Sequence, residues 1–227
     1  MNAYLLRRGG YSLRSYFTAF AATENPLLEG GAWRTPINFY KAPQTTPGRC
    51  FSNGTTDNFD DALAQLISPQ LSGDTRITTR IFRQGGYTPV GDVSHECGHY
   101  HRILIDNSNP ANTLVRGYEF LFPFNSGTFQ IVAWLAVNHS FPDNFSILSP
   151  TPLNGGLQPV QDNDVLVTEV QIVAGVQTLR AYQNGTQIAT LVDNTWTSGG
   201  GPGMGMYPNA GATPSNYCFR DWLAELI

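Results

Sequence analysis

The sequence contains little charge and no long hydrophobic run. Only 13% of its 227 residues are charged, and the net charge is −4 at pH 7. Such a chain has no electrostatic basis for binding nucleic acid or an acidic membrane surface. No apolar stretch approaches the roughly 20 residues needed to cross a bilayer. We therefore expect neither a nucleic-acid partner nor insertion into a membrane.

Cysteine is scarce and widely spaced. Cys50, Cys97 and Cys218 form no C-x-x-C pair, the spacing typical of zinc knuckles and thioredoxin-like sites. An odd number of cysteines cannot all pair within one chain. We therefore expect buried free thiols and no disulfide framework.

The N-terminal segment lacks the pattern of a cleaved secretory signal, because its arginine pair follows a very short apolar stretch. Its basic character and a Gly-Gly pair also distinguish it from the rest of the chain. We predict an N-terminal arm over residues 1–14, held by a neighbouring subunit, and one domain over residues 15–227.

Glycine and proline are plentiful, at 23 and 15 residues, as suits short strands linked by turns. The clearest strand signal consists of three alternating runs, Leu166–Val173, Gln177–Tyr182 and Gln187–Val192. Asn184-Gly185 joins the last two, and this dipeptide tolerates the positive φ angles of a type I′ turn. The pattern predicts an antiparallel β-hairpin.

Further alternating runs, separated by turn residues, predict more strands across the chain. These runs are Tyr16–Ala21, Arg49–Asn53, Ala62–Ile67, Thr75–Arg83, His99–Ile105, Val115–Phe122, Phe129–Val137, Gly203–Tyr207 and Tyr217–Leu226. No long amphipathic helix is visible. The sequence predicts an all-β protein, an antiparallel sandwich of two sheets.

The order of these segments resembles the concanavalin A-like lectin/glucanase superfamily, particularly its laminin-G-like branch. The similarity covers roughly residues 60–227 and is carried by Asn184-Gly185, Asp193–Thr195, Gly200–Met204 and Asp221. The resemblance implies a jelly-roll β-sandwich that often binds glycans. It also implies that Asp221 could help to bind a structural Ca²⁺, although one oxygen ligand does not define a site. No cofactor is expected to be required.

The segment His95-Glu96-Cys97-Gly98-His99 matches the H-E-x-x-H signature of zinc proteases. On a helix, the two histidines share one face and a Zn²⁺, and the glutamate serves as general base. Gly98 is a poor helix former, however, and the surrounding residues lack a helical stripe. A zinc-dependent hydrolase is therefore the third functional hypothesis.

As a strand, the same segment places His95, Cys97, His99 and His101 on one face. A metal could then be held by His95 and His99, or by the His99-x-His101 pair. The simpler interpretation is that these are partly exposed histidines on a sheet that faces a glycan or a subunit.

Catalytic carboxylates of the laminarinase type, E-x-D-x-x-E on one strand, are missing from the sequence. Glu119 and Glu169 are isolated, and we expect them to face solvent. A polysaccharide lyase would need a converging set of side chains. The candidates for it are Arg116, His99, Gln130 and Tyr118. A glycan-active hydrolase or lyase is thus the second hypothesis.

A glycan-binding surface has a softer signature in two adjacent strands. Arg116, Tyr118 and Phe120 alternate along one strand, and Gln130, Val132 and Trp134 along the next. Sugars stack on aromatic rings and accept hydrogen bonds from arginine and glutamine. Rings at this period also often fill a sandwich core. The candidate glycan-binding residues are His99, His101, Arg116, Tyr118, Gln130 and Trp134.

We therefore expect a non-enzymatic, lectin-like binding or structural module. The basic arm and the missing signal suggest a virion or phage surface protein that is assembled in the host cytoplasm. Its partners would be a glycan or cell-surface polysaccharide, and neighbouring subunits that residues 1–14 contact.

Overall fold

The computed structural model describes residues 14–37, 41–54, 62–85, 96–124, 129–137, 145–149, 159–207 and 213–227. The predicted arm lies outside this part, except for its last residue, Arg14, whose carbonyl accepts a hydrogen bond from the Leu226 N–H. His95 also lies outside it.

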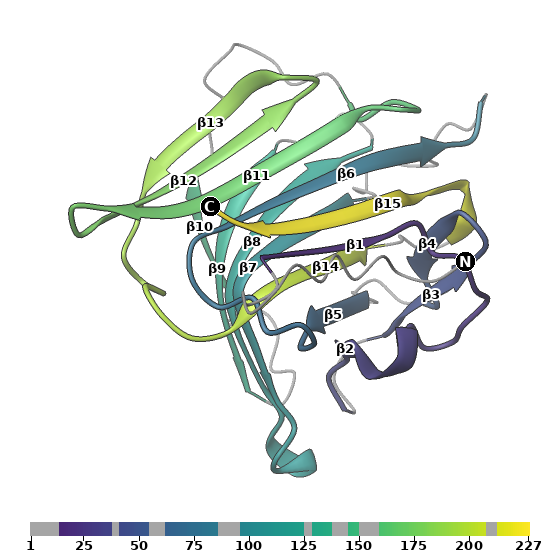
Figure 1. The fold of residues 1–227 in the computed structure, drawn as a ribbon, viewed down its shortest axis with the longest axis horizontal. Helices are drawn as coiled ribbons and strands as arrows, with labels where there is room; N and C mark the ends of the chain where they lie inside the picture. The colour runs from purple at the N-terminus through teal and green to yellow at the C-terminus, as the bar shows by residue number, and fades with distance from the viewer. Residues whose placement is uncertain are drawn as a thin grey trace, which may run out of the picture.

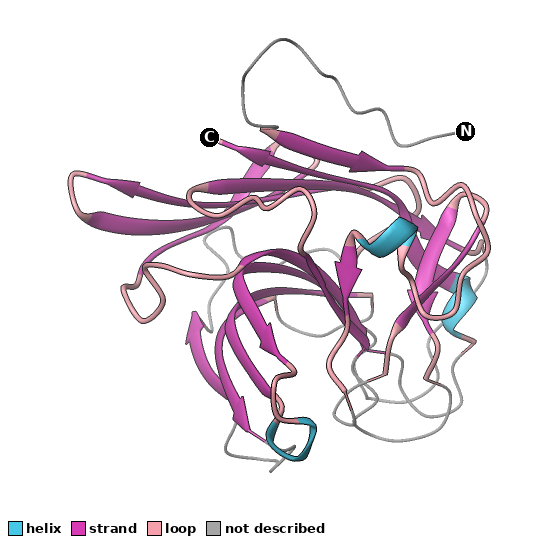
Figure 2. Cartoon of the chain, turned by 60° about the horizontal axis from the view of Figure 1, so that its bottom comes forward, coloured by secondary structure: helices cyan, strands magenta, loops and turns pink. Residues whose placement is uncertain are grey.

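The described strands form two antiparallel sheets, which Figure 1 labels and Figure 2 shows as two layers. In spatial order, sheet A consists of β13 (Thr186–Val192), β12 (Val176–Gln183), β11 (Val165–Val173), β6 (Thr75–Arg83), β15 (Tyr217–Leu226), β4 (Arg49–Ser52) and β3 (Pro43–Thr46), with β1 (Ser15–Thr18) also paired to β15. Sheet B consists of β10 (Phe145–Ser149), β9 (Gln130–Val137), β8 (Leu114–Pro123), β7 (Glu96–Asp106), β14 (Gly201–Tyr207), β5 (Ala62–Leu66) and β2 (Trp33–Arg34). The predicted all-β, two-sheet antiparallel sandwich is confirmed.

Helical structure in the described residues is limited to short 3-10 turns. These are η1 (Glu29–Gly31), η2 (Pro110–Asn112) and η3 (Pro214–Asn216). No helix among the described residues has the length and apolarity to cross a membrane.

The main core lies between the inner faces of the sheets. Alternation along β15 and β6 turns residues such as Trp222 and Ile77 inward, against Phe120 and Met204 of sheet B. Trp222 is fully buried and meets Trp33 edge-to-face at 4.9 Å between ring centroids. The aromatic residues therefore hold the two layers together.

The three cysteines lie in both layers of this core. Cys50 is on β4 and Cys218 on β15 of sheet A, whereas Cys97 is on β7 of sheet B. All three are free and buried. The predicted buried thiols are confirmed, and burial raises the pKa of each thiol.

The predicted hairpin is present as β12 and β13. Asn184 and Gly185 have φ angles of 52° and 79° at the turn, as the Asn-Gly signal requires. Antiparallel pairing of β11 with β12 extends the same meander. The other predicted strands also occur, with small shifts at their ends, whereas β2, β3 and β10 were not predicted.

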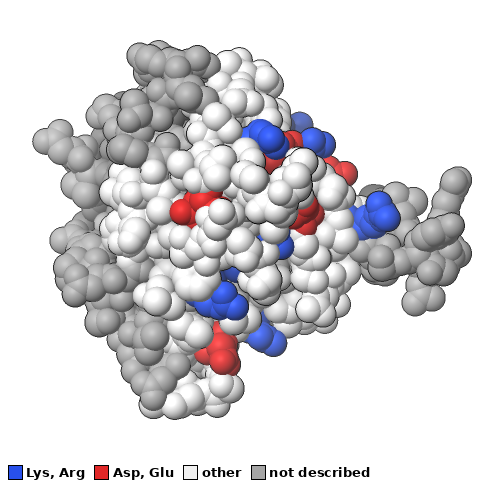
Figure 3. All heavy atoms as spheres, turned by 90° about the vertical axis from the view of Figure 1, so that its left-hand side faces the viewer, with Lys and Arg blue, Asp and Glu red and all other residues white. Residues whose placement is uncertain are grey.

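Charged side chains on the exposed side of sheet A occur in mixed pairs. Glu169 lies 2.6 Å from Arg76 and 3.7 Å from Arg180, measured between carboxylate oxygen and guanidinium nitrogen. Glu169 is on the outer face of sheet A, as expected, but only 7% of it is exposed because its arginine partners shield it from solvent. On the side of the molecule in Figure 3, described residues of both signs are interspersed on a largely uncharged surface.

Candidate functional site

His99 and His101, expected to be partly exposed, are buried between the sheets. The exposed fraction of each is 0%. Both rings project from β7 into the core, where they contact Phe120, Phe122 and Phe219. A ligand outside the sandwich does not reach them, and the expected exposure is wrong.

A chain of hydrogen bonds joins the two sheets through these histidines. His101 Nδ1 lies 2.7 Å from Thr75 Oγ1, and its Nε2 lies 2.7 Å from Thr168 Oγ1. The Thr168 hydroxyl is also 3.0 Å from His99 Nδ1, and His99 Nε2 is 2.8 Å from Thr79 Oγ1. A neutral imidazole has one donor and one acceptor nitrogen, so alternation with hydroxyls satisfies every ring nitrogen. Burial lowers the pKa of His99 to about 3 and that of His101 well below its ordinary value.

The H-E-x-x-H segment does not form the zinc site of a protease. Its described part, from Glu96, lies on strand β7. Glu96 and His99 are three positions apart in this strand, so their side chains point to opposite faces of sheet B. The helical geometry that the signature needs is not formed by Glu96–His99, so the structure gives the zinc-hydrolase hypothesis no support.

Asp221, the other predicted metal ligand, lies on sheet A. Its carboxylate accepts hydrogen bonds from the Arg80 backbone N–H at 3.0 Å and from Arg80 Nη2 at 2.7 Å. His99 points into the core from the other sheet, so the two do not converge. Within the described ranges, no group of three His, Cys, Asp or Glu residues is placed to hold a metal ion. A structural Ca²⁺ stays a prediction.

Four of the predicted glycan- or lyase-site residues are divided between the two faces of sheet B. Tyr118 is paired with Ala133, and residues directly opposite each other share a face. Trp134 and Gln130 are one and three positions from Ala133 on β9, so they point the opposite way. Tyr118 and His99 are in the core. The structure therefore does not bring this set together.

Tyr118 and Arg116 instead fix the loop between β13 and β14. The Tyr118 hydroxyl donates to Asp193 Oδ1 at 2.6 Å and accepts hydrogen bonds from Gln177 Nε2 and the Trp196 N–H. Arg116 lies over the Trp196 ring, 4.9 Å from its centroid. Burial, followed by the hydrogen bond to Asp193, raises the pKa of Tyr118. These contacts give both residues a structural role.

The outer face of sheet B, which turns away from sheet A, carries a polar row that crosses four strand pairs. In the strand register, one residue on each of β8, β7, β14, β5 and β2 is paired directly with a residue on the next strand. Directly paired residues point to the same face. We call this set the outer row, and it consists of Glu119, Tyr100, Gly203, Gln65 and Arg34.

Glycines beside the outer row make room for its larger side chains. A Cβ on Gly98 would overlap the Glu119 carboxyl group, and one on Gly205 would overlap the Tyr100 ring. Both side chains therefore lie across neighbouring strands. Along β14, Met204 and Met206 point into the core, so the alternating glycines face outward and leave space for these side chains.

Glu119 is a buried carboxyl group at the centre of the outer face. Only 5% of it is exposed, so the expectation that it faces solvent is wrong. Its Oε2 accepts a hydrogen bond from Trp134 Nε1 at 2.7 Å, and Tyr100 also hydrogen-bonds the carboxyl group. Burial raises the pKa of Glu119 to about 7, and the two hydrogen bonds offset only part of this rise. The Trp134 ring in turn packs against Phe145 at 5.2 Å between centroids.

We expect Glu119→Gln to stabilise the protein near pH 8 and to change little near pH 4. The folded-state pKa of about 7 exceeds the ordinary 4.5, so folding becomes less favourable as the pH rises between these values. The cost reaches about 3 kcal/mol above pH 7, and glutamine avoids it. Urea unfolding at both pH values measures the difference. An equal change at both would contradict a buried, protonated acid.

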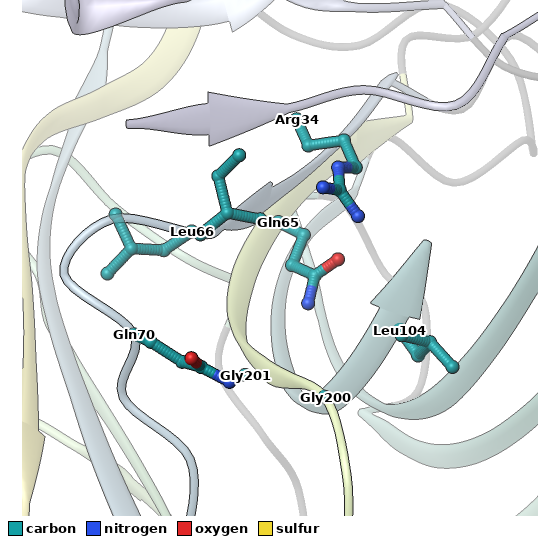
Figure 4. Close-up of a pocket in the computed structure, with 8 residues that line it drawn as sticks. Arg34, Gln65, Leu66, Gln70, Leu104, Gly200 and Gly201 are labelled. Carbon is teal, nitrogen blue, oxygen red and sulfur yellow. The ribbon is translucent and has the colours of Figure 1, made fainter. Parts of the chain in front are cut away.

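The other end of the outer row opens into a cavity of about 250 Å³ (Figure 4). The cavity lies where β5 ends and β14 begins. The described residues that line it are Arg34, Gln65, Leu66, Ile67, Gln70, Leu104, Gly200 and Gly201.

One main-chain residue holds both polar side chains at this cavity. The N–H of Ile105 donates to Gln65 Oε1 at 3.0 Å, and its carbonyl accepts a hydrogen bond from Arg34 Nη1 at 3.2 Å. Because the Gln65 oxygen is engaged, the amide presents its NH₂ group to the cavity. Figure 4 shows both side chains reaching from adjacent strands into the same space.

Strand β2 is short, but its surroundings fix the position of Arg34. Trp33 is buried in the core. Beyond Arg34, Asn107 Nδ2 donates to the Thr35 carbonyl at 2.9 Å, and Asn107 Oδ1 accepts from the Ile37 N–H at 3.1 Å. The chain is thereby held on both sides of the arginine.

The sequence pattern did not single out Arg34 or Gln65. Arg34 lies in a strand of two residues, too short to show alternation. The sequence feature that could have indicated these residues is a polar side chain within an apolar strand. Gln65 interrupts Ala62–Leu66, and Glu119 lies among the aromatic residues of β8. Such residues indicate a buried polar group that needs partners.

No family model and no curated protein sequence matches the chain. Solved structures do. The potassium-bound carbohydrate recognition domain of Emp46p is similar with a TM-score of 0.52 and 12% identity, over 92% of this chain and 94% of that one.

Two further structures match at lower TM-scores. The carbohydrate-binding module CBM66 from Bacillus subtilis has a TM-score of 0.48 and 11% identity, over 86% of this chain and 95% of that one. The endo-1,3-beta-glucanase from Streptomyces sioyaensis has a TM-score of 0.48 and 9% identity, over 94% and 96%.

At such identities the likeness concerns the fold alone, an antiparallel sandwich of two sheets in this chain. The predicted resemblance is confirmed at this level. The chain has the concanavalin A-like jelly-roll fold.

Proposed function

We propose that this protein binds carbohydrate at the outer face of sheet B, with the cavity beside Arg34 and Gln65 as the site of contact. One observation carries the proposal: two polar side chains from adjacent strands converge on an open cavity. Arginine and glutamine donate hydrogen bonds to sugar hydroxyls, and concave sites with few polar groups are typical of ligand binding. The Emp46p domain, which shares the fold, is a carbohydrate recognition domain, and this supports the proposal.

Binding to an array of immobilised neutral and acidic oligosaccharides tests the proposal. We expect selective retention of some glycans, and Gln70→Trp should weaken it about 10-fold or more because the indole fills the cavity. Gln70 is exposed, so this change should spare folding. The matched control is Gln84→Trp, an exposed glutamine after β6 that does not line the cavity. Failure to retain any glycan, or equal binding by the two variants, would refute the proposal.

A glycan-active enzyme stays an alternative prediction. One observation favours it: Glu119 is a buried carboxyl group with a raised pKa on the proposed glycan-binding face. A glycosidase needs a second carboxyl group at roughly 5–9.5 Å. Glu96 lies on β7 on the same face as Gly98, two positions before it, and the Glu119 carboxyl group lies over Gly98. Release of reducing ends from a glycan that the protein retains would decide between binding and hydrolysis.

The place on a virion surface and the assembly role of residues 1–14 also stay predictions. Residues 1–13 lie outside the described part of the chain. The proposed carbohydrate binding depends on neither.

A further inference from the structure

The positive charge of the cavity favours one class of glycan over others. This inference rests on the proposed function. Among the described residues that line the cavity, Arg34 is the one charged residue, and none carries a carboxylate. Arg34 offers guanidinium N–H groups, and Gln65 offers its amide NH₂ group. The fixed side-chain groups are therefore donors, which a negatively charged acceptor complements.

Arg34 forms no ion pair within 4.0 Å in the described part of the chain. The ion pairs found there involve other arginines. Asp106 is close enough to have its pKa lowered, first by hydrogen bonds with Ser108 and to a smaller extent by Arg34. Its carboxylate, however, accepts the Ser108 N–H at 2.9 Å. With one nitrogen bonded to the Ile105 carbonyl and no ion pair among the described residues, the guanidinium keeps N–H groups for a ligand.

Orientation distinguishes this arginine from an ordinary surface arginine. Arg34 Nη1 is bonded to the Ile105 carbonyl, so one edge of the guanidinium is engaged, and the planar group is held beside the Gln65 amide. Gln65 is only 6% exposed and is directly paired with Arg34 across β5 and β2. A preoriented guanidinium suits the planar geometry of an oxyanion better than a mobile lysine would.

Size limits the ligand to a small unit. The cavity of about 250 Å³ is below the range of roughly 300–1,000 Å³ common for drug-sized ligands. Leu66 and Leu104 supply apolar wall, and Gly200 and Gly201 expose main chain. We propose that the cavity binds the oxyanion of one acidic sugar residue, a carboxylate or a sulfate ester, with Arg34 as the charged donor and Gln65 as the orienting donor.

Titrations followed by NMR of the ¹⁵N-labelled protein test this inference. The probes are glucuronate, galacturonate and galactose 6-sulfate, with glucose, galactose and sodium acetate for comparison. We expect at least one acidic sugar to bind about 10-fold more tightly than its neutral counterpart, and this preference to weaken as salt screens the charge. The uronates and the sulfate distinguish the two oxyanions.

Arg34→Gln should remove the preference for acidic sugars, and Arg34→Lys should retain part of it, because lysine keeps the charge but loses the planar fork. Arg80→Gln is the matched control, since Arg80 is an exposed arginine on sheet A. Its preference should equal that of the parent protein.

The outcomes separate this inference from the proposed function. Equal binding of acidic and neutral sugars that Gln70→Trp blocks would overturn the acidic preference and leave carbohydrate binding intact. An acidic preference that survives Arg34→Gln would place the anion elsewhere and overturn the inference. If acetate binds as tightly as the uronates, the site recognises the anion and not the sugar, and the acidic-sugar inference fails while the glycan array still decides carbohydrate binding. If neither the array nor the titrations show any sugar bound, both conclusions fail.

Discussion

Acidification is expected to unfold this protein steeply, because two imidazoles are buried without charge between its sheets. In the unfolded chain a histidine takes up a proton near pH 6.5. In the folded protein, His99 does so only near pH 3, and the pKa of His101 is also well below its ordinary value. The unfolded state thus binds more protons below pH 6.5. The stability that the two rings confer is complete above that pH and is lost as the pH falls toward 3.

The expected loss is large compared with the stability of an ordinary domain. Each histidine contributes about 1.4 kcal/mol per pH unit to the unfolding free energy, and the pair about 2.7 kcal/mol. Glu119 opposes this between about pH 7 and 4.5, because its buried carboxyl group is already protonated in the folded state. Below pH 4.5 that compensation ends. Since domains are stable by about 5–15 kcal/mol, the decline should become steepest there.

Urea unfolding at a series of pH values measures this slope. His101→Gln should reduce it by about 1.4 kcal/mol per pH unit, since glutamine can hydrogen-bond Thr75 and Thr168 without titrating. Ile77→Val is the control, because it lowers core stability equally at every pH. The imidazole ¹⁵N shifts of the folded parent protein provide a second measurement. Charged rings near pH 5 would contradict the prediction.

The second large effect is expected for Gly200→Ala, at the wall of the cavity. Gly200 has a φ of +68°, and a Cβ there would overlap the main-chain carbonyl oxygens of Arg102 and Ile103. Those carbonyls belong to the bulge of β7, where the pairing register shifts, so the main chain has little freedom to retreat. We expect a loss of about 3–5 kcal/mol in unfolding free energy, from steric overlap added to left-handed strain.

Gly199→Ala separates the two causes. Gly199 has a similar φ of +76°, but its Cβ would meet only the guanidinium end of Arg116, with Nη2 nearest at 3.0 Å. This flexible end can move, so about 1–2 kcal/mol of left-handed strain is expected. Chemical unfolding of both variants gives the comparison. Equal losses would show that the overlap with β7 is not the cause.

The strand pattern was predictable because burial imposes alternation on each strand. Thr75–Arg83 and Tyr217–Leu226 were predicted with their observed bounds, since core residues such as Ile77 and Trp222 recur along each. Asn184-Gly185 fixed a turn by its backbone preference alone. The unpredicted strands are short or polar: Trp33–Arg34 and Pro43–Thr46 carry no clear apolar period. Tertiary pairing, rather than local sequence, defines them.

The site was less predictable, because period 2 tells which residues share a face but not which face is exposed. His99 and His101 alternate with Gly98 and Tyr100, and the sequence offered no way to know that the histidines face the core. The deciding information comes from β6 and β11, whose threonines satisfy the imidazoles. Polar partners that are distant in sequence therefore reversed the orientation expected from residue type.

The three buried cysteines give the protein built-in probes of its own opening. Alkylation requires a thiolate, and each thiol is enclosed and has a raised pKa in the folded state. Iodoacetamide should therefore modify Cys50, Cys97 and Cys218 only as often as their strands become exposed. Equal modification rates would report that both sheets open as one cooperative unit, whereas faster labelling of Cys97 would report that the sheet bearing the outer row separates first.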